Sequence, residues 1–179
     1  LSLEHINVLD LSVIHSGRYG RRPLFVSTLV RDLFHRRSIA RRREELELPT
    51  DIPRFWLLID EAHQFAPSGK SSLAKEDIIR WVKEGRQPGL SMVIASQQPS
   101  ALDMDVLSQW DVILSHSMTT SVDKSALNSL TKDYMGSDLK VYIEKIARTG
   151  EAVFVDDYEE RALMVKVAPR RSKPGGSEN

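Results

Sequence analysis

An apolar run that ends in two carboxylates limits most strongly how this chain can fold. Phe55–Ile59 carries an apolar side chain at every position, and Asp60 and Glu61 follow directly. Such a run is typical of a strand in a parallel sheet that helices cover on both faces. A second, mostly apolar run, Ser91–Ser96, follows a helix expected from about Ser72 to Glu84. A strand, a helix and a strand in this order predict a parallel pair.

The rest of the chain continues this alternation. Apolar residues recur at helical spacing after Pro23 and predict one long helix there. Further strands are expected at 6–11 and 111–115, helices at 122–135 and 138–148, and a hairpin at 152–155 and 162–167. We therefore predict an α/β fold in one domain over residues 1–168, with a mostly parallel sheet flanked by helices and a C-terminal β-hairpin. Residues 169–179 are polar and turn-rich, so we expect a disordered tail.

The composition limits the function classes. The 179 residues carry no net charge, so any nucleic-acid binding must come from local patches. The chain has no cysteine, which excludes disulfides and thiolate metal sites and makes a cytoplasmic setting the simplest expectation. No apolar run approaches the ~20 residues that cross a bilayer, so we expect no membrane partner. Because the first residue is Leu1 and not Met, we interpret this end as a truncation of a longer chain.

The carboxylates after the first strand predict a phosphoryl-transfer site. Ligands of open α/β sheets bind beyond the carboxyl ends of the strands. At that place Asp60 can hold Mg²⁺ through a coordinated water, and Glu61 can polarise a water that attacks a phosphate. The alternative is that both residues only end a strand and cap a helix, because carboxylates favour helix starts.

An amide after the second strand supports the same site. The strand ends in Ser96 and Gln97, and a glutamine there can sense a γ-phosphate or orient the attacking water. Taken alone, these residues are better explained as an ordinary polar turn before Pro99. Two neighbouring strands that each end in groups a nucleotide site needs favour the nucleotide interpretation.

Five segments carry residue patterns that occur together in one family. Leu57–Pro67 is a strand end with a carboxylate pair followed by Ala-His-x-Phe-x-Pro. Four more patterns follow in order, in Lys83–Leu90, Ile94–Ser100, Val106–Gln109 and Gly150–Ala152. In these patterns and in their order the chain resembles the HerA–FtsK superfamily of P-loop ATPases, and the first segment resembles its Walker B region.

The resemblance implies a fragment of a RecA-like P-loop NTPase core that binds ATP and Mg²⁺. It also implies a homo-hexameric ring that translocates double-stranded DNA, with a nuclease partner in the case of HerA. By resemblance, Asp60 is the Mg²⁺ carboxylate, Glu61 the water-activating base and Gln97 the γ-phosphate sensor, beside Ser96. Arg86 falls where the family places a basic residue near the nucleotide of its own or a neighbouring subunit. The alternative for Arg86 is a helix-end arginine that faces solvent or an interface carboxylate.

The chain departs from the family pattern at two positions and in one loop. Gln87 and Gln98 stand where lysine and arginine are usual, which bears on rate and inter-subunit sensing more than on the fold. The phosphate-binding Walker A loop, Gly-x-x-x-x-Gly-Lys-Ser/Thr, is missing. The Gly-Lys-Ser sequence at 69–71 has Gln64 where the first glycine should stand, so Lys70 is expected in a solvated loop. We expect the true loop to precede Leu1 and the chain alone to bind ATP weakly.

Other charged residues have simpler explanations. The basic run from His35 to Arg43 can follow DNA phosphates. However, Arg41–Glu45 and Arg43–Glu47 have i,i+4 spacing, which favours a surface helix with salt bridges. His63 has no second ligand at metal spacing, so we expect it to pack or to support a neighbour.

Three functions fit these features. The first is an ATP-driven motor subunit that moves double-stranded DNA. The second is a P-loop ATPase of the same clan that drives conjugation or secretion. The third is a degenerate, non-catalytic module that fills a ring position or scaffolds a partner. No residue reads base edges, so we expect no sequence specificity for DNA.

Overall fold

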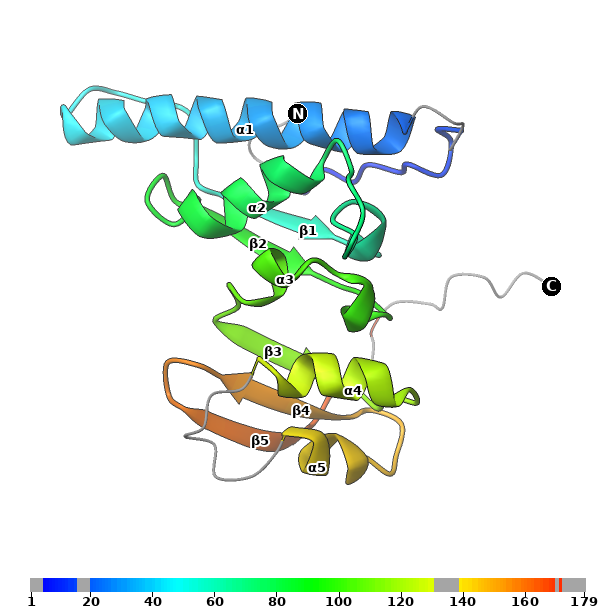
Figure 1. The fold of residues 1–179 in the computed structure, drawn as a ribbon. Helices are drawn as coiled ribbons and strands as arrows, with labels where there is room; N and C mark the ends of the chain where they lie inside the picture. The colour runs from blue at the N-terminus through cyan, green and yellow to red at the C-terminus, as the bar shows by residue number, and fades with distance from the viewer. Residues whose placement is uncertain (1–4, 16–19, 131–138, 170, 172–179) are drawn as a thin grey trace. The chain divides into compact units, whose positions relative to one another are not determined.

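A computed structural model describes residues 5–15, 20–130, 139–169 and 171 (Figure 1). The chain divides into two compact units, residues 1–109 and 110–179, and each is described by itself. The predicted α/β class is confirmed, with one parallel and one antiparallel sheet. None of the helices in the described ranges has the length and the apolar character that crossing a bilayer requires.

The first unit is a parallel pair of strands with helices packed against it (Figure 1). Its elements are α1 Arg21–Glu45, β1 Phe55–Ile59, η1 Ala62–Gln64, α2 Lys75–Glu84, β2 Leu90–Ile94, η2 Pro99–Ala101 and α3 Met104–Leu107. In the parallel pairing, Phe55 lies opposite Leu90 and Ile59 opposite Ile94. The predicted strand–helix–strand unit is therefore confirmed.

A single apolar core holds α1, α2 and the strands together. The predicted stripe of α1 supplies Val30 and Phe34, both buried. The Phe34 ring meets Trp81 of α2 edge-on, with the ring centroids 6.3 Å apart, which is a favourable aromatic geometry. Trp81 and Ile78 are almost completely buried. This packing fixes α2, which connects the carboxyl end of β1 to the amino end of β2.

The opposite face of β1 differs from the prediction. Side chains alternate between the two faces of a strand, and the face away from the core carries Trp56 and Leu58, which are 70% and 69% exposed. The prediction that both faces of this strand are covered is therefore not met within the described part of the chain. The reason is that α1 and α2 contribute to the core on the face of Leu57 and Ile59.

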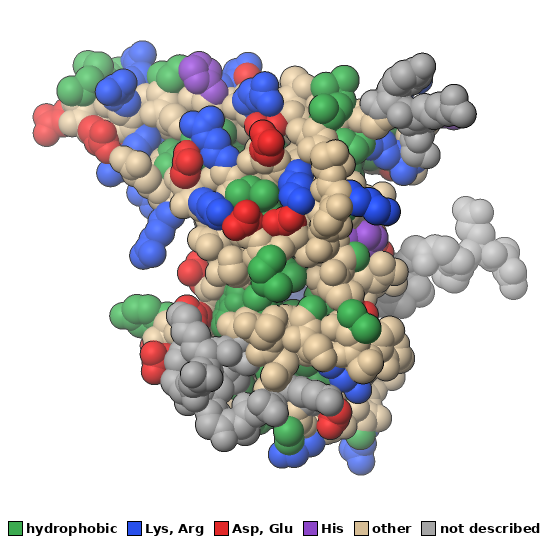
Figure 2. Space-filling view, viewed as in Figure 1, with side chains coloured by type: hydrophobic (Ala, Val, Ile, Leu, Met, Phe, Trp, Pro, Cys, Tyr) green, Lys and Arg blue, Asp and Glu red, His purple; other side chains and the backbone are tan. Residues whose placement is uncertain are grey.

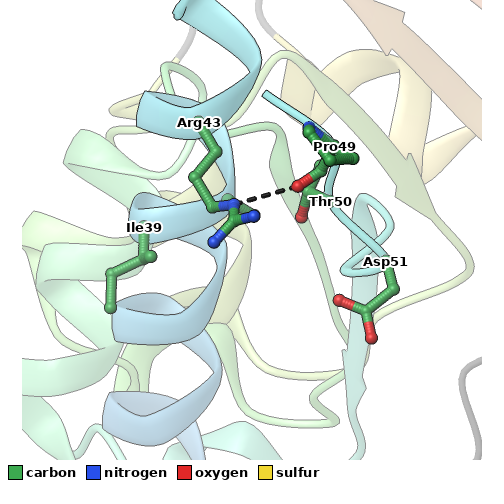
Figure 3. Close-up of a pocket in the computed structure, with 6 residues that line it drawn as sticks. Ile39, Arg43, Pro49, Thr50 and Asp51 are labelled. Carbon is green, nitrogen blue, oxygen red and sulfur yellow. Dashed lines mark hydrogen bonds between the residues drawn. The ribbon is translucent and has the colours of Figure 1, made fainter. Parts of the chain in front are cut away.

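The charged half of α1 is laced with ion pairs, as predicted. Arg41 Nε lies 3.1 Å from a Glu45 carboxylate oxygen, and Figure 2 shows basic and acidic side chains interleaved over α1 and α2. The predicted Arg43–Glu47 pair is wrong, because the helix ends at Glu45 and Glu47 turns to a positive φ of 57°. Arg43 instead donates to the Pro49 carbonyl at 2.9 Å, beside a broad hollow of about 560 Å³ (Figure 3).

The expected strand at residues 6–11 does not form. Ile6 is 94% and Val8 85% exposed, and β1 and β2 pair only with each other among the described strands. A strand is stable only with a hydrogen-bonded neighbour, and this segment has none in the described ranges. Arg22 of α1 holds the following turn by donating to the carbonyls of Ile14 and Ser12.

The second unit is an antiparallel sheet with two short helices. Its elements are β3 Val112–Ser115, α4 Ser121–Asn128, α5 Leu139–Glu144, β4 Glu151–Asp156 and β5 Arg161–Lys166, in the sheet order β3-β4-β5. The predicted terminal hairpin is confirmed by the β4–β5 pairing. Its core comprises Leu127, Leu139, Ile143, Val153 and Val155. Helix α4 ends at Asn128 and α5 at Glu144, so both helices are shorter than predicted. Residues 131–138 and nearly all of the predicted tail lie outside the described residues.

Candidate functional site

The candidate site lies where β1 and β2 end at a common edge. Beyond the strands the parallel ladder continues, because the Ala95 N–H donates to Ile59 O at 2.9 Å and the Ala62 N–H to Ala95 O at 3.1 Å. These two bonds lock the residues after β1 beside the residues after β2. The acidic pair and the amide are thereby held next to each other, at the carboxyl ends of the strands where α/β sheets bind ligands.

The side chains that follow the two strands are in direct contact. Gln97 Nε2 donates to Glu61 Oε1 at 2.6 Å. Asp60 is exposed, and its Oδ1 accepts the Glu61 backbone N–H at 2.9 Å. The structure therefore brings together Asp60, Glu61 and Gln97, as well as Ser96. A carboxylate held by an amide, next to a solvent-facing carboxylate, can bind a cation and polarise a water.

His63 joins this group from the 3-10 turn that follows Glu61. Its Nδ1 lies 3.1 Å from Ser96 Oγ and 3.3 Å from Glu61 Oε2. The contact with Ser96 is the better hydrogen bond of the two. Glu61 Oε2 has no hydrogen-bond partner in good geometry among the described residues. Ser96 Oγ also accepts the Gln98 N–H at 3.1 Å. His63 thus supports its neighbours, the role that the sequence left open for it.

Glu61 has an uncommon backbone conformation. Its φ of 48° and ψ of 44° lie in the left-handed region, which is costly for residues with a Cβ atom. Non-glycine residues in this region cluster at functional sites, where the surrounding structure enforces the conformation. At this position the left-handed turn orients the Glu61 carboxylate toward Gln97. Sequence patterns give no signal for this feature, because glutamate rarely adopts it.

The loops beyond the two strands are tied to each other beneath the site. Pro67 and Leu102 form an antiparallel bridge. Lys75 of α2 forms an ion pair with Asp103 and donates to the carbonyls of Pro67 and Lys70. Burial alone raises the pKa of Asp103, but the Lys75 ammonium and the Asp105 N–H together outweigh burial and lower it. Lys70 itself is exposed, as expected for a solvated loop.

The donors at the edge suit Mg²⁺ only in part. Mg²⁺ in nucleotide sites is held by one or two carboxylates together with phosphate oxygens and waters. Asp60 offers one exposed carboxylate of this kind. Within the described ranges no cluster of three or more acidic or histidine ligands is present. The residues therefore fit a metal that is completed by a nucleotide and water, and not a metal held by the protein alone.

Arg86 is not brought to this edge. It follows α2 and precedes β2, whereas Gln97 follows β2. A five-residue strand, such as β1 or β2, spans about 16 Å at its usual rise, so Arg86 lies at the opposite, amino edge of the pair. Arg86 is exposed. Of the residues predicted for the site, the structure groups four and separates this one.

Comparison with known proteins shows which proteins this chain resembles in sequence. The chain is 25% identical over 178 residues to the DNA double-strand break repair helicase HerA of Sulfurisphaera tokodaii, covering 99% of this chain and 34% of that protein. It is 28% identical over 190 residues to the protein of the same name from Pyrococcus furiosus, covering 90% of this chain and 32% of that protein. The chain thus spans about a third of the length of these curated relatives.

Similarity to solved structures concerns the fold. The genome packaging NTPase B204 of Sulfolobus turreted icosahedral virus 2, in complex with ATPγS, matches with a TM-score of 0.52 and 16% identity, over 64% of this chain and 52% of that one. The same NTPase in complex with AMPPCP matches with a TM-score of 0.52 and 17% identity. No protein-family profile matches the chain. By these matches the chain is similar in sequence to HerA helicases, and its fold is similar to that of a genome packaging NTPase.

Proposed function

We propose that the carboxyl edge of β1 and β2 supplies the magnesium- and water-binding half of an ATPase site that drives movement along double-stranded DNA. The observation that carries the proposal is the 2.6 Å contact between Glu61 and Gln97, next to Asp60. It is supported by the names of the sequence relatives, which are DNA repair helicases. The nucleotide complexes of the structural neighbour agree with it.

Each residue at the edge has a distinct role in this proposal. Asp60 would hold Mg²⁺, which neutralises phosphate charge when it is bound. Glu61 accepts a proton from the attacking water, and general-base catalysis of this kind contributes about 10²–10⁴-fold to a rate. Gln97 orients Glu61 in the structure described here, and in the nucleotide complex it is free to contact the γ-phosphate. His63, which contacts Ser96, lies 3.3 Å from the second carboxylate oxygen of Glu61.

The proposed role of Arg86 depends on several copies of the chain assembling. A guanidinium stabilises the charge that develops on a transferred phosphoryl group. Because Arg86 lies at the far edge of the strands, we assign it to the nucleotide of a neighbouring copy in a homo-hexameric ring. This arrangement uses one edge of each copy for its own ATP and the other edge for its neighbour's. A nuclease partner belongs to the same proposal by analogy with HerA.

The test is a Glu61→Gln substitution in the complete protein that contains this chain. We expect ATP turnover to fall by about 10²–10⁴-fold, because an amide does not accept the proton, while ATP binding is retained. Wild-type turnover is expected to rise when double-stranded DNA is added. Glu76→Gln serves as the matched control, since Glu76 is an exposed residue in the first turn of α2.

Two results would contradict the proposal in different ways. Unchanged turnover in Glu61→Gln would remove the catalytic role of this edge and favour a non-catalytic ring or scaffold module. Turnover that depends on Glu61 but does not respond to DNA would keep the ATPase. It would then favour a motor for conjugation or secretion.

A further inference from the structure

A second polar site lies at the amino edge of β1 and β2. A pocket of about 220 Å³ is lined by arginines from three separate segments. Arg37 and Arg41 come from α1, Arg54 directly precedes β1, and Arg86 follows α2. The remaining wall is the turn Gln87–Gly89. We call this site the arginine pocket.

Arg37 is the buried anchor of the arginine pocket. Its side chain is only 1% exposed, and one terminal nitrogen donates to Glu44 at 2.9 Å. Its Nε and Nη1 atoms are buried and have no hydrogen-bond partner among the described residues. Leaving charged donors buried without acceptors is costly. These two nitrogen atoms are closed to solvent, so a ligand in the pocket would feel the charge of Arg37 at close range without hydrogen bonding to its Nε or Nη1.

The charge of the arginine pocket is not balanced by its own acids. Arg41 is paired with Glu44 and Glu45. The hydrogen bond from Arg37, followed by the charges of the surrounding arginines, lowers the pKa of Glu44, which therefore stays ionised. Neither Arg54 nor Arg86 has an ion-pair partner in the described part of the chain. Four guanidinium groups against two carboxylates leave an excess of two positive charges.

Gly89 shapes the wall of the arginine pocket. Its φ is +83°, which side chains rarely permit. A Cβ atom built at this position would lie 3.0 Å from Cγ and 3.2 Å from Cδ of Arg54. Glycine therefore lets the stem of Arg54 lie against the backbone. This contact positions the stem of Arg54 at the pocket wall, while the residue as a whole remains exposed.

We propose that the arginine pocket binds a free phosphate-type oxyanion, such as pyrophosphate or the phosphate end of a small polyphosphate. All four basic residues are arginines, whose planar forks match phosphate oxygens in pairs, whereas lysine acts as a point charge. A small anion of two or more charges offsets the excess charge and supplies acceptors to the exposed Arg54 and Arg86. The pocket shares Arg86 with the proposed function, so the test of this proposal varies Arg54 and Arg37 and leaves Arg86 unchanged.

The first test is titration calorimetry with pyrophosphate in buffer without magnesium. We expect binding to wild type that weakens with salt, because the contacts are ionic. Arg54→Gln should lose at least about tenfold in affinity, equivalent to about 1.4 kcal/mol. Arg54→Lys should fall between the two, since it keeps the charge but not the fork. Arg36→Gln is the matched control, because Arg36 lies on α1 next to Arg37 and pairs with Asp32 outside the pocket.

Thermal unfolding gives a second readout that does not depend on one variant. Pyrophosphate should raise the Tm of wild type and of Arg36→Gln by mass action. Arg37→Met, which replaces the buried charge with an apolar side chain of similar length, should fold and lose this Tm increase. Glu61→Gln should bind pyrophosphate as wild type does, so this proposal and the ATPase proposal fail independently.

Three outcomes would overturn the proposal. One is equal pyrophosphate affinity in wild type and Arg54→Gln. Another is binding that depends on Arg54 only when magnesium nucleotide and a second copy of the chain are present, which would assign the whole pocket, and not Arg86 alone, to an inter-subunit contact. The third is an Arg54-dependent affinity for duplex DNA with no measurable affinity for pyrophosphate, which would assign them to the DNA backbone.

Discussion

The two edges of the β1–β2 pair carry opposite chemistry. At the carboxyl edge, Glu61 and Gln97 are joined beside Asp60, and the group is acidic and polar. At the amino edge, Arg54 and Arg86 border a pocket with excess positive charge. The same two strands position both groups. The difference follows from parallel pairing, because residues before the strands share one edge and residues after them share the other.

In the proposed ATPase, this comparison gives a reason why a neighbouring copy is needed to complete each site. One edge offers groups that bind a cation and a water, and the other offers guanidinium groups that stabilise anionic oxygens. Because about 16 Å of strand separates the edges, one copy cannot apply both to the same phosphate. In the proposed ring, the acidic edge of one copy meets the basic edge of the next.

The largest expected effect is on ATP turnover in assemblies that mix variants of the two edges. Glu61→Gln and Arg86→Ala should each lower turnover by about 10²-fold or more, the first as a lost base and the second as lost charge stabilisation. In a mixture of the two, random assembly pairs an intact Glu61 with an intact Arg86 at about a quarter of the head-to-tail interfaces. We therefore expect ATPase activity to return on mixing, measured as phosphate release.

The outcome of this mixing separates two arrangements. If Arg86 acted on the nucleotide of its own copy, no site in the mixture would hold both intact residues, and activity would stay at the level of the single variants. Arg36→Ala is the control for loss of an exposed arginine on the neighbouring helix α1.

An intermediate effect is expected at Lys75, which ties the loops beneath the carboxyl edge. Lys75→Met should lower the free energy of unfolding by about 2 kcal/mol. The substitution removes charged hydrogen bonds and leaves the partly buried Asp103 without its ion-pair partner. The lowered pKa of Asp103 makes this contribution present at neutral pH. It should be lost as pH falls below about 4 and through the folded-state pKa, where the carboxylate is protonated.

Urea unfolding at neutral and acidic pH measures this dependence. The difference in stability between wild type and Lys75→Met should shrink in acid. Lys70→Met, at an exposed position in the loop before α2, should show no comparable loss of stability at either pH. A difference that stays constant with pH would mean that Lys75 acts through packing and its carbonyl contacts, and not through Asp103.

The smallest expected effect concerns the backbone at Glu61. Glu61→Gly and Glu61→Ala both remove the carboxylate, so their difference isolates the left-handed conformation. The Glu61→Gly variant should have a free energy of unfolding about 1 kcal/mol higher than Glu61→Ala, measured by chemical denaturation. At Glu76, which lies in a helix, the order should reverse, because glycine is less stable than alanine there by up to about 1 kcal/mol. The same order at both positions would argue against strain at Glu61.

Much of the fold could be predicted from local patterns. The stripe of Val30 and Phe34 predicted α1, and the apolar run at β1 predicted a strand in a parallel pair. The prediction of a strand at residues 6–11 was wrong. An apolar run forms a buried strand only where a neighbouring strand is available to pair with it. The Arg43–Glu47 pair failed because the helix ended two residues too early for Glu47.

The candidate site was predictable in its members and not in its details. Asp60 and Gln97 follow adjacent apolar runs, and that order along the chain is enough to place them at one edge. The same reasoning applied to residues before the strands would have placed Arg54 with Arg86, a signal that is present in the sequence. The contact of His63 with Ser96 required the 3-10 turn after Glu61, whose left-handed residue no pattern reveals.

By itself, the amino-acid order determined which residues end the strands, because side-chain chemistry and apolar periodicity are local properties. The tertiary structure alone decided that Arg37 is buried with two nitrogen atoms unpaired among the described residues, and that Gly89 makes room for Arg54. Those features depend on α1 crossing segments about 15 to 50 residues away in the chain, and distances between such segments arise only from packing.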